Sequence, residues 1–202
     1  MNVGWWVLNG VPDQHPMRLG AILDTIPIDM TPYQTQLVRI YYKGRLSTDS
    51  LAALIGSAKQ KWPRALILPG NEPDVPAEGY NGNPIDYANL ICDAAKLSGT
   101  RVWYPGISPT NTREWLLPAL GRAEIEGYSL HVYGLTVDEM LSQIPLDMLQ
   151  GQRWGISETN FGYGRVADRN QWASVFREFL RIVERLGCEY CAYFAREWPY
   201  PD

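Results

Sequence analysis

The stretch Ala65–Asp74, ALILPGNEPD, contains the strongest indication of the fold. Its first half is short and wholly apolar, which is typical of a strand buried on both faces of a parallel sheet. Pro69 and Gly70 then interrupt the pattern, and Asn71 and Glu72 follow at the point where the chain should turn. An amide and a carboxylate placed directly after a buried strand indicate a functional site at the carboxyl edge of a sheet. Asp74 is expected to be a loop residue leading towards the next helix.

Strands and helices alternate on the C-terminal side of this stretch. Asn83 and Pro84 predict the cap and first turn of a helix that ends at Gly99. Thr136 and Glu139 have the spacing of a capping box. The remaining expected strands cover residues 101–108, 127–134, 153–160 and 189–198, and the other helices cover 112–123, 137–144 and a long segment from Asp168 to Gly187. Thr110 or Asn111 is expected to cap the helix over 112–123.

The pattern is looser before Ala65. Strands are expected over residues 4–10 and 37–44, with a helix over 50–62. A weak helix over 17–26 and a short strand near 26–30 lie between the first two strands. Alternation of this kind predicts an α/β fold with a parallel sheet. A compact (β/α)8 TIM barrel with reduced or irregular N-terminal βα units accounts for the number of expected strands. Residues 1–202 are expected to form one domain. The rival is an open doubly wound sheet, which would carry a glycine fingerprint after its first strand.

Composition excludes several classes of function. The chain has 202 residues, 46% of them hydrophobic and 20% charged, and a formal net charge of −4. No basic run is present, so a nucleic-acid partner is not expected. No apolar segment reaches the length of a membrane span, and the N-terminus has no basic and apolar leader, so neither a membrane span nor a secretion signal is expected. Only 2 His occur, too few for a His-ligated metal centre, so no metal or other cofactor is expected. Cys188 and Cys191 are expected to be buried thiols.

Polar residues end several of the expected strands. In a barrel these ends meet at one mouth, where catalysis occurs. They carry the residues Arg39, Asn71, Glu72, His131, Tyr133, Glu158 and Trp198. Two carboxylates brought to one mouth are what the cleavage of a glycosidic bond requires, one as an acid and one as an ionised partner. His131 and Tyr133 are two residues apart, so they point to the same face of their strand.

The segments GNEP and SETNFG, residues 70–73 and 157–162, resemble the two catalytic motifs of the clan A retaining glycoside hydrolases. Counted from the C-terminus, Glu72 follows the fifth strand and Glu158 ends the second, which matches the strand-four and strand-seven positions in that clan. The resemblance implies that Glu72 is the acid/base and Glu158 the nucleophile. The implied substrate is a poly- or oligosaccharide with a β-linked O-glycosidic bond.

The resemblance also implies roles for the other residues at the mouth. Asn71 would contact the sugar 2-hydroxyl, Tyr133 would steady the nucleophile, and His131 would lie near the acid/base. Arg39 matches the clan's early-strand arginine, and Trp198 matches its last-strand aromatic platform under the sugar. Two alternatives stay open from the sequence. One is a catalytically silent sugar-binding barrel, and the other is a sugar-phosphate enzyme that uses the glycine-rich loop Gly162–Arg165.

Overall fold

The structure is a computed structural model, and it describes residues 2–7, 19–23, 35–161 and 169–193. Eight strands form one sheet, and every ladder in it is parallel. The strands are β1 (Asn2–Val7), β2 (Leu19–Leu23), β3 (Thr35–Ile40), β4 (Leu66–Pro69), β5 (Val102–Ile107), β6 (Ile125–Gly134), β7 (Trp154–Phe161) and β8 (Cys188–Tyr193). The α/β class and the eight-strand parallel arrangement predicted from the sequence are confirmed.

The strand order is β4-β3-β2-β1-β8-β7-β6-β5, so neighbours in sequence are neighbours in the sheet and β1 pairs with β8. This order is that of a TIM barrel opened between β4 and β5. Among the described residues no ladder joins those two strands. A backbone hydrogen bond from Glu72 N to Gly106 O, 2.9 Å long, crosses between the segments that carry them. We call this junction the β4–β5 seam.

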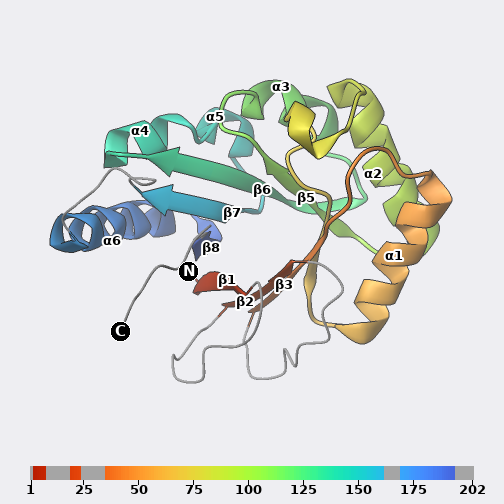
Figure 1. The fold of residues 1–202 in the computed structure, drawn as a ribbon, viewed down its shortest axis with the longest axis horizontal. Helices are drawn as coiled ribbons and strands as arrows, with labels where there is room; N and C mark the ends of the chain where they lie inside the picture. The colour runs from red at the N-terminus through yellow and green to blue at the C-terminus, as the bar shows by residue number, and fades with distance from the viewer. Residues whose placement is uncertain (1, 8–18, 24–34, 162–168, 194–202) are drawn as a thin grey trace.

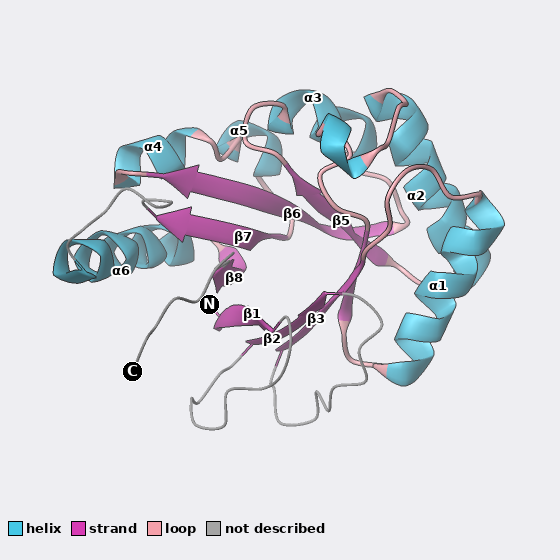
Figure 2. Cartoon of the chain, in the orientation of Figure 1, coloured by secondary structure: helices cyan, strands magenta, loops and turns pink. Residues whose placement is uncertain are grey.

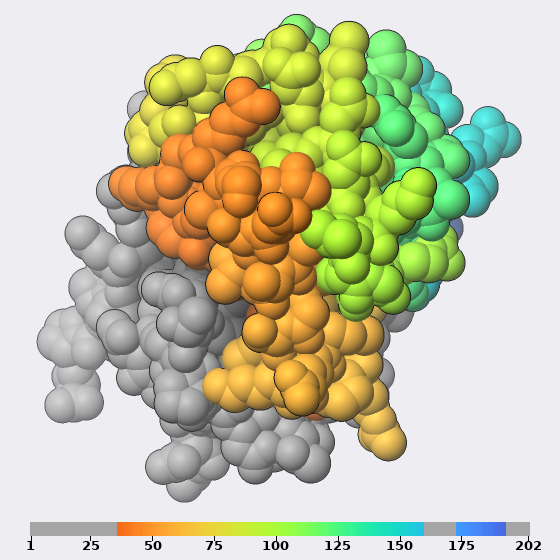
Figure 3. Space-filling model, turned by 90° about the vertical axis from the view of Figure 1, so that its right-hand side faces the viewer, coloured from red at the N-terminus to blue at the C-terminus, as the bar shows by residue number. Residues whose placement is uncertain are grey.

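The helices lie on the outer side of the strands (Figure 1). They are α1 (Thr48–Lys61), α2 (Pro84–Ser98), α3 (Thr112–Leu116), α4 (Val137–Ser142), α5 (Leu146–Leu149) and α6 (Arg169–Arg185), with short 3-10 turns η1 (Pro76–Glu78) and η2 (Leu117–Ala119). Figure 2 distinguishes these helices from the strands by colour. Helices α1 and α2 pack side by side, and Figure 3 shows their segments together on one face of the molecule.

Local sequence signals explain where several helices begin and end. The Asn83 side chain accepts a hydrogen bond from the Asp86 amide at the start of α2, and Gly99 ends that helix with a φ of 66°. Thr136 and Glu139 form both hydrogen bonds of a capping box at α4, as predicted. Asn111 occupies the N-cap position of α3, but its side chain makes no capping hydrogen bond.

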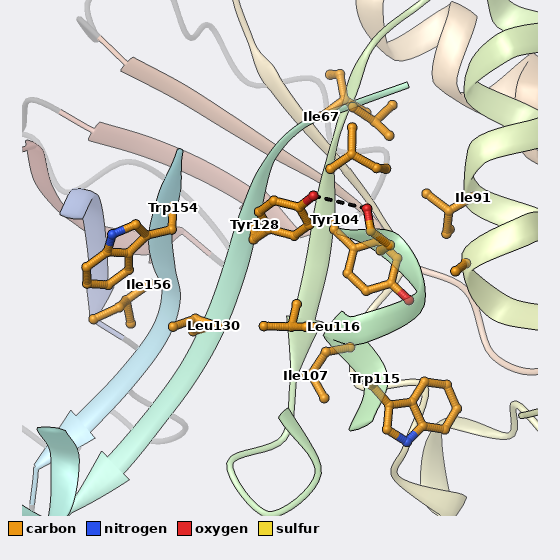
Figure 4. Packing of buried hydrophobic residues seen from close by; sticks show 14 of the residues in the cluster. Ile67, Ile91, Tyr104, Ile107, Trp115, Leu116, Tyr128, Leu130, Trp154 and Ile156 are labelled. Atoms are coloured by element: carbon orange, nitrogen blue, oxygen red, sulfur yellow. Dashed lines mark hydrogen bonds between the residues drawn. The ribbon is translucent and has the colours of Figure 1, made fainter. Parts of the chain in front are cut away.

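Strand residues alternate between two hydrophobic clusters. The larger cluster includes buried residues of the helices, such as Ile55, Ile91 and Phe179, so its strand residues face outward towards the helices. The smaller cluster holds only strand residues and therefore lies inside the barrel; it consists of Leu37, Leu68, Trp103, Tyr190 and Ala192. Figure 4 shows part of the larger cluster on the neighbouring strands β6 and β7, including Leu130 and Ile156.

One expectation for the N-terminal part is wrong. Where the weak helix over residues 17–26 was expected, residues 19–23 form strand β2, because Leu19 to Ile22 pair with β1 and Leu19 to Leu23 pair with β3. A short apolar run fits either element, and here the neighbouring strands decide between them. The short strand expected near residues 26–30 lies outside the described residues. The three free cysteines Cys92, Cys188 and Cys191 are buried, as expected for the last two.

Candidate active site

Two glutamates from different strands meet at the carboxyl end of the sheet. Glu72 lies three residues after the end of β4, and Glu158 lies within β7, three residues before that strand ends. His131 on β6 joins the two, since its Nδ1 lies 2.7 Å from Glu72 Oε1 and 3.8 Å from Glu158 Oε2. Both distances start from one nitrogen, so these two oxygens lie no further apart than 2.7 plus 3.8 Å, or 6.5 Å. The structure therefore brings the two predicted carboxylates together.

The surroundings of Glu158 stabilise its ionised form. Arg39 Nη1 donates to Glu158 Oε1 in a buried ion pair, and the Tyr133 hydroxyl donates to Glu158 Oε2 at 2.5 Å. Burial raises the pKa of the Glu158 carboxyl. The charge of His131 when protonated, the Arg39 guanidinium, and the hydrogen bonds from Tyr133 and Arg39 together outweigh burial and hold that pKa below its ordinary value.

Tyr133 remains a hydrogen-bond donor over the whole physiological range. Its pKa is raised by burial in the first place and by the charge of Glu158 in the second. His131 and Tyr133 both reach the carboxylates from β6, which confirms the prediction that their side chains share a face. In the β6–β7 ladder His131 is the register partner of Glu158, and a register shift just before it sets this alignment.

The tautomer of His131 follows from its two neighbours. Arg39 Nη2 lies 3.3 Å from His131 Nε2, and a guanidinium can only donate, so Nε2 is the acceptor in the neutral ring. Nδ1 then carries the hydrogen and donates to Glu72 Oε1 at 2.7 Å. Glu72 Oε1 is thereby engaged by His131.

The two glutamates differ in their access to solvent. The side chain of Glu158 is 6% exposed, whereas that of Glu72 is 19% exposed. A buried ionised carboxylate and a more accessible one beside it are suited to nucleophilic attack and to proton transfer with water, respectively.

Asn71 lies next to Glu72 but forms no part of this network. Its Oδ1 is buried and makes no hydrogen bond with the described residues, so a buried acceptor is available beside the carboxylates. Trp198 and the loop Gly162–Arg165, both singled out in the sequence, lie outside the described residues.

Residues that sequence analysis did not assign to the site also shape it. Gly106 on β5 provides the space for His131, because a Cβ there would lie 2.1 Å from His131 Nε2. Asp74, expected to be a plain loop residue, accepts hydrogen bonds from Ser108 and Asn111 on the loop after β5. The sequence offers one signal that Asp74 belongs to the site, its position two residues after Glu72. Its hydrogen-bond partners cannot be found from the local sequence, because they lie more than 30 residues away in the chain.

The described part of the chain contains no cluster of three or more His, Cys, Asp or Glu side chains arranged to hold a metal ion. Within the same part, none of the helices has the length and apolar character needed to cross a membrane.

Known proteins resemble this chain in structure and not in sequence. No protein-family profile matches the sequence, and no curated protein matches it. A GH128 subgroup IV endo-β-1,3-glucanase from Lentinula edodes superposes with a TM-score of 0.64 at 17% identity, covering 96% of this chain and 82% of that one. A GH128 subgroup VI exo-β-1,3-glucanase from Aureobasidium namibiae gives a TM-score of 0.64 at 15% identity over 93% of this chain and 76% of that one.

A third similar structure is the GH39 enzyme from Xanthomonas axonopodis pv. citri, with a TM-score of 0.62 at 11% identity over 88% of this chain and 52% of that one. At these identities the likeness establishes the fold. The chain has a TIM-barrel fold, as its sequence predicted.

Proposed function

We propose that the protein is a retaining glycoside hydrolase that cleaves a β-linked O-glycosidic bond in a poly- or oligosaccharide. Glu158 is the proposed nucleophile and Glu72 the proposed acid/base. One observation supports this assignment above all others: both carboxylates lie within reach of a single nitrogen of His131. Retaining enzymes place their carboxyl groups about 5–5.5 Å apart, and inverting enzymes about 6.5–9.5 Å apart. The upper bound of 6.5 Å between the oxygens favours the retaining class.

The reaction follows from the environments of the two groups. Glu158, kept ionised by Arg39 and Tyr133, attacks the anomeric carbon while Glu72 Oε2 donates its proton to the departing oxygen. A covalent glycosyl-enzyme results. Glu72, now ionised, removes a proton from water, the water oxygen attacks the anomeric carbon, and Glu158 departs as a carboxylate. Because the anomeric centre is attacked twice, its configuration is retained.

The other site residues bind and orient the sugar in this proposal. Asn71 Oδ1, buried and free of bonds to the described residues, would accept a hydrogen bond from the sugar 2-hydroxyl. His131 holds Glu72 Oε1 and so directs the opposite oxygen at the glycosidic bond. Trp198 is proposed as the aromatic platform under the sugar. Since two of the similar structures are β-1,3-glucanases, β-1,3-glucan is the first polymer to test.

Trapping the covalent intermediate tests the proposal. The protein is incubated with 2,4-dinitrophenyl 2-deoxy-2-fluoro-β-glucoside, in which fluorine slows both steps and the good leaving group lets the first one proceed. The intact mass should rise by one fluoroglucosyl unit, and peptide mapping should place the label on Glu158. Glu158→Gln is the matched control and should acquire no label. A label on Glu72, or an inverted product from β-1,3-glucan observed by NMR, would contradict the mechanism.

A further inference from the structure

Asp74 connects two loops across the β4–β5 seam. Its Oδ1 accepts a hydrogen bond from Ser108 N at 3.1 Å. Its Oδ2 accepts from the Ser108 hydroxyl and from Asn111 Nδ2, the latter at 3.0 Å. Ser108 is buried and follows β5 directly. Three hydrogen bonds therefore join the loop that carries Glu72 to the loop that follows β5.

This connection lies where the barrel has no ladder. In the described sheet β4 and β5 are its two ends, so sheet pairing does not fix the distance between them. Besides the Asp74 hydrogen bonds, the bond from Glu72 N to Gly106 O crosses the seam. The acceptor in all three Asp74 hydrogen bonds is a carboxylate, and hydrogen bonds to a charged acceptor are stronger than neutral ones.

The backbone of Glu72 needs such support. Its φ is +36°, and it is the only non-glycine residue with a positive φ among those the structure describes. A non-glycine residue in a sparsely populated region of this kind is strained and persists only where its surroundings hold it. The bonds from Glu72 N to Gly106 O and from Val75 N to Glu72 O, both 2.9 Å, hold the peptide on either side.

We propose that Asp74 is a positioning residue for Glu72. Its carboxylate fixes the loop 70–75 against Ser108 and Asn111, and this keeps Glu72 in the conformation in which Oε1 meets His131. The inference rests on the proposed function for the role of Glu72. The hydrogen bonds of the Asp74 side chain go to Ser108 and Asn111, which lie outside the His131 network.

The side chain of Asn111 supports this reading. Asn111 stands at the N-cap position of α3, where an asparagine side chain would ordinarily accept from the helix backbone. Here it makes no capping bond and donates instead to Asp74. The side chain at this helix start is thus oriented towards Asp74, and its amide nitrogen holds the loop that carries Glu72.

The donor and acceptor pattern suggests a pair of substitutions. In Asp74→Asn an amide nitrogen takes the place of Oδ2, so it cannot accept from Asn111 Nδ2 or from the Ser108 hydroxyl, and a new bond to Asn111 requires the Asn111 amide to turn over. In the double variant Asp74→Asn, Asn111→Asp the polarity is reversed and a donor again faces a carboxylate. The single variant should lose the connection, and the double variant should regain most of it. Asp86→Asn is the control. Asp86 also accepts a hydrogen bond from an asparagine side chain, that of Asn83, but in the first turn of α2.

Leaving-group dependence separates positioning from general damage. An aryl glycoside with a dinitrophenolate leaving group needs no proton, whereas β-1,3-glucan needs an acid in the right place. In Asp74→Asn we expect kcat/KM for the glucan to fall about 10- to 100-fold, as misplacement of a catalytic group does, with a change below threefold for the dinitrophenyl substrate. Equal losses on both substrates, or no recovery in the double variant, would overturn the proposal.

A second measurement does not depend on activity. Hydrogen exchange of the Glu72 amide, followed by NMR, reports the bond to Gly106 O. Exchange should be faster by at least tenfold in Asp74→Asn and unchanged in Asp86→Asn, while amides of α2 keep their rates. Unchanged exchange of the Glu72 amide in Asp74→Asn would overturn the proposal, whether or not the wild-type protein is active. Failure of the wild-type protein to cleave any glycoside would count against the proposed function alone. If Asp74→Asn does not fold, Asn111→Ala, which removes one bond, should shift the same readouts in the same direction by a smaller factor.

Discussion

Glu158 carries a buried negative charge that three neighbouring side chains stabilise. Arg39 is 2% exposed and Glu158 is 5% exposed, so both ions have lost nearly all of their water. Removing one partner of a buried pair costs about 3–5 kcal/mol, because the other charge is left without compensation. The same groups that stabilise this charge in the folded state would keep Glu158 ionised for its proposed role as nucleophile, so the proposal couples stability and chemistry at this residue.

The hydrogen bond from the Tyr133 hydroxyl lowers the pKa of the Glu158 carboxyl. A hydrogen bond to the ionised form lowers a carboxyl pKa, so its loss in Tyr133→Phe should raise the pKa of Glu158. Because the proposed nucleophile must be ionised, the acidic limb of the kcat/KM profile should move to higher pH, with a larger loss of kcat/KM on that limb than at neutral pH. Tyr128→Phe is the matched control, since Tyr128 is also buried and hydrogen-bonded, but to the backbone of Ala119 and Gly121. An acidic limb that does not move would show that another group governs it.

The same ionisation should make the fold sensitive to acid. The pKa of Glu158 in the folded state lies below its ordinary value of 4.5, so its stabilising contribution is complete above that value and is lost as pH falls through the folded pKa. Glu158→Gln should be less stable than wild type at pH 7 by about 3–5 kcal/mol. Urea unfolding at several pH values should show this difference shrinking below pH 4.5. A difference that is constant across the pH range would mean that the lost contacts are not electrostatic.

At the residue scale, sequence reasoning found the groups with local signals. Glu72 comes three residues after a buried strand, and Glu158 belongs to a motif at the expected spacing, so both could be predicted. His131 and Tyr133 could be predicted from strand alternation. The role of Asp74 could not, because its partners Ser108 and Asn111 lie on another loop and meet it only after the strands have assembled.

At the element scale, the inner face of the barrel pairs large rings with glycines. A Cβ on Gly127 would lie 2.8 Å from the Trp103 ring, and one on Gly155 would lie 2.5 Å from the Tyr190 ring. Gly106 opposite His131 extends this arrangement to the active-site end of β5. Strand glycines are thus required here by the close approach of a ring from a neighbouring strand.

Gly106→Ala should therefore disable the site and leave most of the fold intact. The new methyl group must displace His131, at a cost of about 1–3 kcal/mol for overpacking, and Glu72 loses its partner. We expect kcat/KM for β-1,3-glucan to fall more than tenfold while the circular dichroism spectrum is unchanged. Gly56→Ala on α1 is the control, because a Cβ there meets nothing within 4 Å. It should raise the free energy of unfolding by about 0.5–1 kcal/mol through helix propensity, with full activity.

Elements with explicit start and stop signals were predicted well. Helix α2 has Asn83 and Pro84 at its start and Gly99 at its end, and the structure uses all three. Strand β2 was mistaken for a helix because its apolar residues carry no periodicity over five positions. It is a strand because it pairs with β1 and β3. Pairing between separate segments cannot be predicted from a local hydrophobic pattern.

At the scale of the whole molecule, the two ends of the barrel serve different purposes. The carboxyl end carries Glu72 and Glu158, whereas the amino end is held by charges on neighbouring strands. Arg153, just before β7, donates to Glu189 on β8 at 2.6 and 2.7 Å and also pairs with Glu126 on β6. Its guanidinium lies 5.3 Å from the centre of the Trp103 ring. The pKa of Arg153 is raised, first by the hydrogen bond to Glu189, so the side chain stays charged.

Arg153→Ala should consequently reduce stability without reducing activity. The side chain is 46% exposed, so solvent screens its pairs, and the network is expected to contribute about 1 kcal/mol. For a chain of this length that corresponds to a fall in Tm of about 2–4 °C, measured by calorimetry. Because the pairs are exposed, the difference from wild type should narrow in 1 M salt. Arg153→Lys keeps the charge but loses the paired hydrogen bonds to Glu189, so its Tm should be intermediate. The kcat/KM of all three proteins should agree within twofold, since the substitutions lie at the end of the barrel away from the glutamates. A loss of activity that matches the loss of stability would instead mean that the two ends are mechanically coupled.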